Sequence, residues 1–472
     1  MKFKQFSFIL YFTSHLFVFA EAAQKDLGEN LKNGSPSRPL TNNDNQSSRW
    51  TGVGLLSTPN GTCTAVLIDT RGVGWTTTAP AYVITAGHCV LAEHGTSKLN
   101  HELNASVAFN YFQDTADNNK TYKVRTAIWT SMLGTDLAIL ELEKPLSALL
   151  QDQIMPLELS PTPPLFSHDV LNVGAPGTFT NRALRLSACA QEVSRTISGV
   201  QPAFPGGLVN ECKDLDYGSS GSPMVDRRTN KITSIVSERH YGFSPAFLSN
   251  CFINGIFSNG TENCDLQQIN VQVDFESLFL RSKLRPEIGP SGNELMPTWN
   301  FKFSIDTPYY RYKTVRDAQS RERPEDYSAA ISATKGHIND SVGPETRMHV
   351  LCIIGVRSIE KNLTTALLKN AFTHAGHLAE PAPEPAFGYN EKFTSMQWEG
   401  AYPDFSSHFF YTTLVDSTPC ADFRDTRYKK AAALELLSPD SPLKICSYAS
   451  NESDPQPSAT RFDLIAPPAT DQ

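Results

Sequence analysis

Residues 85–89 of the chain are Thr85-Ala86-Gly87-His88-Cys89, residues 134–140 are Gly134-Thr135-Asp136-Leu137-Ala138-Ile139-Leu140, and residues 218–223 are Gly218-Ser219-Ser220-Gly221-Ser222-Pro223. A serine hydroxyl is a poor nucleophile at neutral pH and needs a base, and an imidazole is suitable because its unperturbed pKa lies near that pH. A buried carboxylate holds such a ring in the correct tautomer, and glycines let backbone N–H groups converge on a developing oxyanion. The three stretches together contain every part of a His–Asp–Ser site.

In this order, the three stretches resemble the His, Asp and Ser motifs of trypsin/chymotrypsin-like serine peptidases. The resemblance covers about residues 50–280 and implies an all-β, chymotrypsin-like double β-barrel. It also implies a serine endopeptidase that hydrolyses peptide bonds through an acyl-enzyme, with protein or peptide substrates and no cofactor. His88 is then the general base, Asp136 the orienting carboxylate and Ser220 the nucleophile, with the Gly218 and Ser220 N–H groups as oxyanion hole. The Ser motif is similar to that of bacterial glutamyl-endopeptidase-like members.

The primary specificity has several interpretations. Asp214 stands six residues before Ser220, where trypsin-like members carry the carboxylate that binds Arg or Lys. Asp216 is the alternative for this role, and a third interpretation makes both residues solvated loop residues. A preference for acidic side chains would instead use basic groups such as Arg239 and His240. The strand that ends at Ser237 resembles the one on which a peptide substrate adds by β-augmentation.

The nine cysteines are expected to form disulfides, because the chain has features of an exported protein. The resemblance implies a Cys63–Cys89 bridge that staples the His88 turn to the neighbouring strand. Proximity in the sequence favours Cys189 with Cys212, Cys251 with Cys264 and Cys420 with Cys446, which leaves Cys352 odd. The cysteines show no Cys-x-x-Cys pair and no spacing with histidine that is typical of zinc, so no metal site is predicted.

The first 22 residues have the features of a signal peptide, namely Lys2 and Lys4, an apolar run from Phe6 to Ala20, and the small residues Ala20 and Ala22. They predict secretion, to the extracellular space or the periplasm. An uncleaved membrane anchor is the alternative, although the apolar run is short for a membrane span. Residues 23–49 are polar and predict a flexible leader or propeptide.

Short apolar runs separated by turn residues predict a β-rich peptidase domain over 50–284, and residues 286–297 have the composition of a linker. Beyond it, Tyr309–Lys313 followed by His349–Ile354 is weakly repeated by Phe409–Thr413 followed by Leu443–Tyr448. The repeat predicts two β-sandwich-like modules, over 298–390 and 391–472, unless two β-rich stretches are similar by chance.

The composition limits the class of partner. A net charge of −8 gives no basic footprint for nucleic acid. The C-terminal modules are candidates for binding a surface or a substrate through Trp398, Tyr402, Phe405, Phe409 and Phe410, although such aromatic residues more often form a core. The other functional hypothesis is a catalytically silent, protease-like binding or adhesion protein. The retention of all three reactive residues argues against it.

Overall fold

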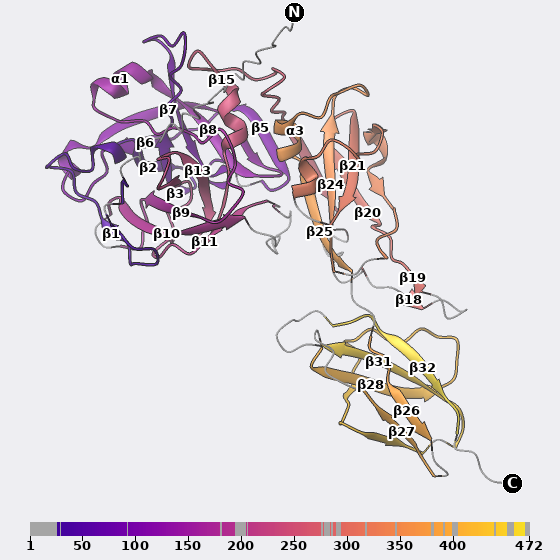
Figure 1. Ribbon diagram of the computed structural model, residues 1–472. Coiled ribbons are helices and arrows are strands. Elements are labelled where there is room, and N and C mark those ends of the chain that lie inside the picture. Colours follow the sequence, from indigo (N-terminus) through magenta and orange to yellow (C-terminus); the bar gives the residue numbers. More distant parts are fainter. Residues whose placement is uncertain are drawn as a thin grey trace, which may run out of the picture.

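A computed structural model describes residues 26–467, except 29, 92, 180–181, 194–203, 205, 275–276, 278–283, 285–286, 289–293, 317–318, 345–346, 379–381, 390–391, 399–404, 439 and 451–456. The expected signal peptide over 1–22 lies outside the described residues, as does Tyr402. Strands dominate the chain, which forms a large N-terminal body and two smaller β units (Figure 1).

The first β-barrel closes because six strands form a ring in which every strand pairs with two others. Going round the ring, each strand is antiparallel to the next, and the long β7 pairs with β8 along one edge and with β6 along the other. Its interior is filled by apolar side chains from alternate positions, such as Val83 and Leu140. The strands of the ring are β2 (Val53–Thr58), β3 (Gly61–Leu67), β4 (Pro80–Thr85), β8 (Asp136–Pro145), β7 (Lys120–Met132) and β6 (Ser106–Phe109).

The second β-barrel is a ring of the same kind. Two closed six-stranded barrels confirm the fold class expected from the resemblance. The strands of this ring are β9 (His168–Gly174), β10 (Arg185–Val193), β11 (Leu208–Asn210), β14 (Tyr241–Phe243), β13 (Ile232–Glu238) and β12 (Pro223–Asp226).

The leader lies along the second barrel where the structure describes it. The short strand β1 (Arg38–Pro39) pairs with β10, and the next residue, Leu40, is buried. Asp26 forms an ion pair with Arg227, and the backbone N–H of Ser37 donates to Asp214. The polar composition predicts a flexible leader or propeptide. The described part of this segment makes these backbone and charge contacts with the second barrel.

The two C-terminal units are β-sandwiches with the same strand order. Each has one three-stranded sheet, β17–β20–β23 or β26–β27–β30, facing one four-stranded sheet, β22–β21–β24–β25 or β29–β28–β31–β32. The weakly repeated stretches of the sequence are the paired strands β21 and β24 in the first sandwich and β28 and β31 in the second. The topology therefore supports the expected repeat.

The strand bounds of the sandwiches show where each unit begins. β17 precedes the expected linker, and β26 precedes residue 390, so both sandwiches begin earlier than composition indicated. The strands of the first are β17 (Ile269–Val273), β20 (Phe301–Ile305), β21 (Tyr309–Val315), β22 (Ile331–Ser332), β23 (His337–Ile338), β24 (Arg347–Val356) and β25 (Phe372–Leu378). Those of the second are β26 (Ala386–Tyr389), β27 (Thr394–Gln397), β28 (Ser407–Leu414), β29 (Lys429–Lys430), β30 (Glu435–Leu437), β31 (Leu443–Ser450) and β32 (Arg461–Ile465).

The first sandwich is continuous with the first barrel. Strand β5 (Thr96–His101) pairs with β7 on one side and with β17 on the other, so one ten-stranded sheet runs from the barrel into the sandwich. The helix α3 (Thr365–Lys369) lies at this junction (Figure 1). Further elements are α1 (Leu146–Gln151) and the hairpins β15 (Phe252–Ile253) with β16 (Ile256–Phe257) and β18 (Glu287–Ile288) with β19 (Glu294–Leu295).

Four disulfides cross-link the chain, and they are the four pairs expected from the sequence: Cys63–Cys89, Cys189–Cys212, Cys251–Cys264 and Cys420–Cys446. Cys352 is buried in the first sandwich. Phe410 is fully buried in the core of the second, and Trp398 packs against that core. These two aromatic residues are therefore core residues, which is the alternative to a binding face.

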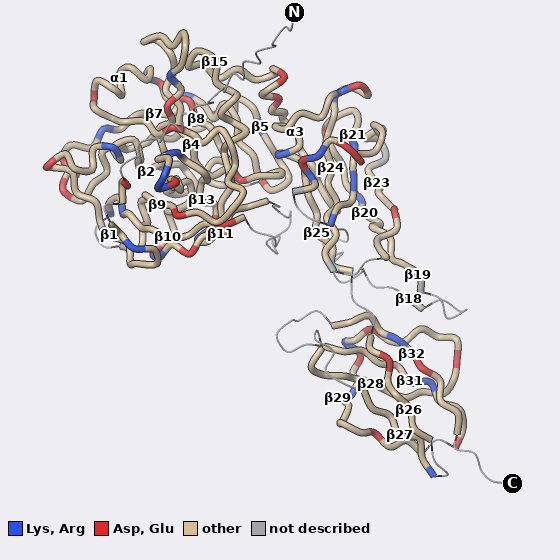
Figure 2. The backbone as a smooth tube through the Cα atoms, viewed as in Figure 1, with Lys and Arg blue, Asp and Glu red and all other residues tan. Residues whose placement is uncertain are grey.

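The charged residues are spread over all three parts of the molecule, with both signs interspersed (Figure 2). None of the helices formed by the described residues has the length and apolar character needed to cross a membrane.

Candidate functional site

His88 lies in a 3₁₀ turn, Gly87–Cys89, that follows β4 of the first barrel. The Cys63–Cys89 disulfide ties this turn to β3. The imidazole is partly exposed, with 35% of the side chain accessible. The turn therefore presents the ring at the barrel surface while the residues on either side of it are held.

Asp136 is the first residue of β8 and is almost completely buried. One carboxylate oxygen accepts the backbone N–H of His88 at 2.8 Å, and the other lies 2.7 Å from His88 Nδ1 and accepts the Ser237 hydroxyl. Burial alone would raise the pKa of this carboxyl, but the charge of His88 and these hydrogen bonds lower it. The group is therefore a buried carboxylate with its charge compensated by donors.

The pKa of His88 reflects two opposing effects. Burial of the ring lowers it, because the charged form loses hydration. The nearby Asp136 charge, the hydrogen bond to it, and the charge of Glu238 act in the opposite direction, and the net pKa is raised above the ordinary value of 6.5. The Nδ1 contact orients the ring so that Nε2 is the nitrogen left to exchange a proton with another group.

Ser220 lies on the second barrel, in the turn that precedes β12. Gly218, two residues earlier, has a φ of +90°, which favours glycine, and a Cβ there would approach the Ala175 carbonyl oxygen to 2.8 Å. Among the described residues, the N–H groups of Gly218 and Ser220 donate to no protein acceptor. Two N–H groups left in this way beside a serine can receive a substrate carbonyl oxygen.

A single serine links the two halves of the site. The Ser220 hydroxyl donates to the Ser237 carbonyl oxygen at 3.0 Å, and the Ser237 hydroxyl donates to Asp136. Ser237 therefore contacts both Ser220 and the carboxylate that binds His88, although no hydrogen bond joins Ser220 to His88 in this state. The site is formed by both barrels, with His88 and Asp136 from the first and the two serines from the second.

The candidates for primary specificity lie in loops with the following surroundings. Asp214 is exposed rather than buried in a pocket, has a φ of +63°, and accepts the Ser37 N–H of the leader at 2.7 Å. Asp216 is paired with Arg239, whose side chain is 68% exposed. His240 is also exposed. These positions agree best with the interpretation that Asp214 and Asp216 are solvated loop residues.

Sequence reasoning missed Thr64, which joins the barrels beneath Ser220. Its hydroxyl donates to the Gly218 carbonyl at 2.8 Å and accepts the Ala175 N–H at 2.9 Å, and its N–H donates to the Ser220 carbonyl at 2.8 Å. Thr64 lies next to Cys63 in β3, and nothing in the local sequence distinguishes it from Thr62 of the same strand. The contact of Ser237 with Asp136 has no signal in the sequence either, because the two residues are 101 positions apart.

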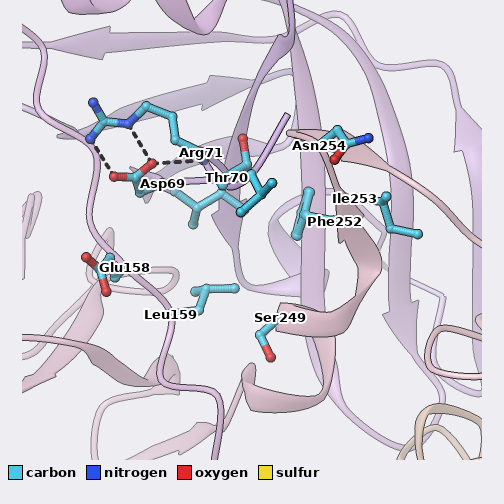
Figure 3. Close-up of a pocket in the computed structure, with 12 residues that line it drawn as sticks. Asp69, Thr70, Arg71, Glu158, Leu159, Ser249, Phe252, Ile253 and Asn254 are labelled. Atoms are coloured by element: carbon cyan, nitrogen blue, oxygen red, sulfur yellow. Dashed lines mark hydrogen bonds and ion pairs between the residues drawn. The ribbon is translucent and has the colours of Figure 1, made fainter. Parts of the chain in front are cut away.

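Two other features of the structure bear on the choice of site. Cys63, His88 and Cys89 bring potential metal ligands within 4.8 Å of one another, but the two cysteines are joined in a disulfide and offer no thiolate. A separate hollow of about 470 Å³ is lined by the Asp69–Arg71 ion pair and residues such as Leu159 and Phe252 (Figure 3). None of the three reactive residues lines it, so the candidate chemistry lies outside this hollow.

Comparison with known proteins gives a family for the peptidase part. Residues 63–235, less than half of the chain, match the model of the trypsin-like peptidase domain. A search of curated proteins finds no match.

Several solved structures are also similar to part of the chain. Kallikrein-related peptidase 10 has 17% identity, with 44% of this chain and 94% of that chain covered and a TM-score of 0.30. The thermostable serine protease AL20 from an extremophilic microorganism has 18% identity, with 42% and 92% covered and a TM-score of 0.29. The protease Anisep from Arthrobacter nicotinovorans has 14% identity, with 42% and 91% covered and a TM-score of 0.28. By its match to the family model and its two closed barrels, the chain contains a trypsin-like peptidase domain.

Proposed function

We propose that the chain is a secreted serine endopeptidase, with Ser220 as nucleophile, His88 as general base and Asp136 as the orienting carboxylate. The observation that carries the proposal is the buried Asp136 carboxylate, which binds both the ring and the backbone of His88 and also binds Ser237, the residue that Ser220 contacts. A carboxylate in this position fixes the imidazole tautomer and stabilises the imidazolium that forms during acyl transfer.

The proposed reaction begins with a change at Ser220. Rotation of its side chain moves the hydroxyl from the Ser237 carbonyl to His88 Nε2, which takes the proton as Oγ attacks the scissile carbonyl carbon. The resulting oxyanion is received by the Gly218 and Ser220 N–H groups. His88 then gives the proton to the leaving amine, the acyl-enzyme forms, and water releases the acyl group by the same steps with water as the nucleophile.

Export of the enzyme is part of the proposal. The features of the first 22 residues favour a signal peptide, and four disulfides are typical of proteins from oxidising compartments. Peptide and protein chains are the proposed substrates, paired in extended form beside the end of β13.

The test is to incubate the purified protein with a diverse peptide library and to map the cleavage sites by mass spectrometry. Ser220→Ala should reduce the rate by roughly 10⁶-fold. The three triad residues act together, so loss of the nucleophile alone costs nearly as much as loss of all three. Ser57→Ala, which changes an exposed serine on β2, should cleave as the wild type does. Equal cleavage by Ser220→Ala and the wild type would overturn the assignment, and no cleavage by any form would favour the silent binding protein.

A further inference from the structure

The loop between β7 and β8 leads directly into Asp136. Its apolar residue, Leu133, packs into the core of the first sandwich and not into the barrel. Leu133 is only 1% exposed and is a member of the hydrophobic core of the first sandwich, together with residues such as Trp299 and Phe372. A leucine that leaves its own barrel to fill a neighbouring core fixes the position of the loop that carries it, because cores are close-packed.

Polar contacts from the first sandwich hold the same loop and the end of β7 that leads into it. Arg321 is buried at 2% exposure and donates from Nη1 to the Gly134 carbonyl at 2.8 Å. The hydroxyl of Ser131 donates to the side-chain oxygen of Asn370 at 2.5 Å. Arg321 and Asn370 lie in different segments of the first sandwich. The Arg321 contact is charge-assisted, and hydrogen bonds of that class are strong. The neutral Ser131–Asn370 contact is a second fixed point, so the two contacts together specify where the loop backbone lies.

Gly134 is the point of closest approach. A Cβ at this residue would lie 2.2 Å from the Ala371 carbonyl oxygen and 2.8 Å from the Ala371 nitrogen. Its φ does not lie in the left-handed region, so the need for glycine comes from the contact with the sandwich. The loop backbone is therefore pressed against the segment that follows α3.

The contacts continue from the loop to the candidate site. Asp136 follows Gly134 by two residues, and a Cβ at Gly87 would lie 2.1 Å from the Ser131 carbonyl oxygen. The loop thus lies between the sandwich on one side and the His88 turn on the other. Any movement of residues 131–134 would change the placement of both members of the His88–Asp136 pair.

We propose that the first C-terminal sandwich is a working part of the peptidase site, and that Arg321, Asn370 and Leu133 are positioning residues that hold the loop carrying Asp136 against His88. This inference rests on the proposed function and assigns a role to residues beyond the trypsin-like domain. Positioning of this kind has a large effect, since a displacement of about 1 Å remote from the chemistry can lower a rate 10²-fold.

The test compares Arg321→Met with Arg321→Lys and with a matched control, Arg311→Met, all in the full chain. Arg311 belongs to the same sandwich and also donates its guanidinium to a backbone carbonyl, that of Ile359. With a peptide substrate, Arg321→Met should lower kcat about 10- to 100-fold and leave KM unchanged, because the substrate contacts are intact. Arg321→Lys should recover part of the loss, and Arg311→Met should behave as the wild type.

The pH profile separates positioning from stability. The charge of Asp136 contributes to the raised pKa of His88, so a loosened carboxylate should move the acid limb of the Arg321→Met profile to lower pH. A serine-directed phosphonate counts the active molecules. The proposal would be overturned if Arg321→Met lowered only that count and left both the kcat per active site and the acid limb unchanged. That outcome would show that Arg321 supports folding alone.

A second pair of variants and a direct readout keep the inference independent of activity. Gly134→Ala should give the same loss as Arg321→Met, whereas Gly72→Ala, where an added Cβ meets nothing within 4 Å, should be silent. NMR titration of His88 in the Ser220→Ala background should show a lower pKa in both loop-disturbing variants. An unchanged His88 pKa would overturn the inference even in an active enzyme, and a chain without Ser220-dependent cleavage would overturn the proposed function whatever the titration shows.

Discussion

The two C-terminal sandwiches have the same seven-strand order but different relations to the rest of the molecule. The first shares its sheet with the peptidase barrel through β17 and β5, and its buried core includes Leu133 of that barrel. Among the described residues, the corresponding core of the second consists of four buried residues, Met396, Phe410, Ile445 and Ile465. One topology therefore occurs once as an extension of the trypsin-like domain and once as a unit with a small core of its own.

The difference shows that one repeated fold can be stabilised in two ways. A sandwich with a large shared core obtains its stability from the surface that it buries against its neighbour. A sandwich with a small core needs additional support, and the second has it in the Cys420–Cys446 disulfide. At the corresponding strand position of the first sandwich, Cys352 is instead buried among Val350 and Ala375.

Truncation is the strongest way to test this comparison. A chain that ends at residue 385 should keep its Ser220-dependent activity, because the first sandwich and its contacts with the loop before Asp136 remain. A chain that ends at residue 297 loses β20 and the core around Leu133, and its activity per molecule should fall at least 10²-fold. The measurement is the rate of peptide cleavage per folded molecule, where the folded fraction is taken from the cooperative thermal unfolding seen by circular dichroism.

The two truncations control each other, since both remove the second sandwich. Equal activity of the two shortened chains would show that the first sandwich is an appendage like the second. A loss of activity already in the chain ending at 385 would show that the second sandwich, too, supports the site.

A second test uses two disulfides that close loops of equal length. Cys63–Cys89 and Cys420–Cys446 each have a sequence separation of 26. The chain-entropy model gives the same stabilisation, about 3.5 kcal/mol, for either. Replacing the cysteines of one pair by alanine should therefore destabilise its own unit by a similar amount, which hydrogen exchange in a urea series can measure for each part separately.

Activity should distinguish the two pairs. Loss of Cys63–Cys89 frees the turn that holds His88 and should lower kcat, whereas loss of Cys420–Cys446 should leave kcat unchanged at temperatures where the peptidase is folded. If the second pair also proved necessary for cleavage, the second sandwich could not be regarded as independent of the site.

The comparison also explains which features the sequence could predict. The candidate residues His88, Asp136 and Ser220 are recognisable because each lies in a short local motif, and the disulfides because their partners are near in sequence. The hydrogen bond from Arg321 to Gly134 joins residues 187 positions apart, and that from Ser131 to Asn370 joins residues 239 apart. Neither leaves a local signal. The contact of Asp214 is equally non-local, because its partner Ser37 lies 177 residues away in the polar leader.

The smallest expected effect concerns two histidines whose pKa values are shifted in opposite directions. His88 has a raised pKa, whereas burial lowers the pKa of His408, which stacks on Trp398 in the second sandwich at a ring separation of 4.9 Å. The contribution of His88 to stability is fully present below the unfolded value of 6.5 and is lost as the pH rises through its raised pKa. That of His408 is present above 6.5 and is lost as the pH falls through its lowered pKa.

Acidification should therefore act on the two parts differently. Between pH 7.5 and pH 5, the second sandwich should lose stability in wild-type protein, and His408→Phe, which keeps a ring on Trp398 but removes the titrating group, should lessen that loss. In the peptidase, cleavage should fall on the acid side with a midpoint above 6.5, because His88 must be neutral to accept the Ser220 proton. The measurement is the urea midpoint of the wild type and of His408→Phe across this pH range, together with the kcat/KM profiles. A midpoint of the cleavage profile below 6.5 would contradict the effect assigned to Asp136, since a carboxylate held against His88 favours the protonated ring.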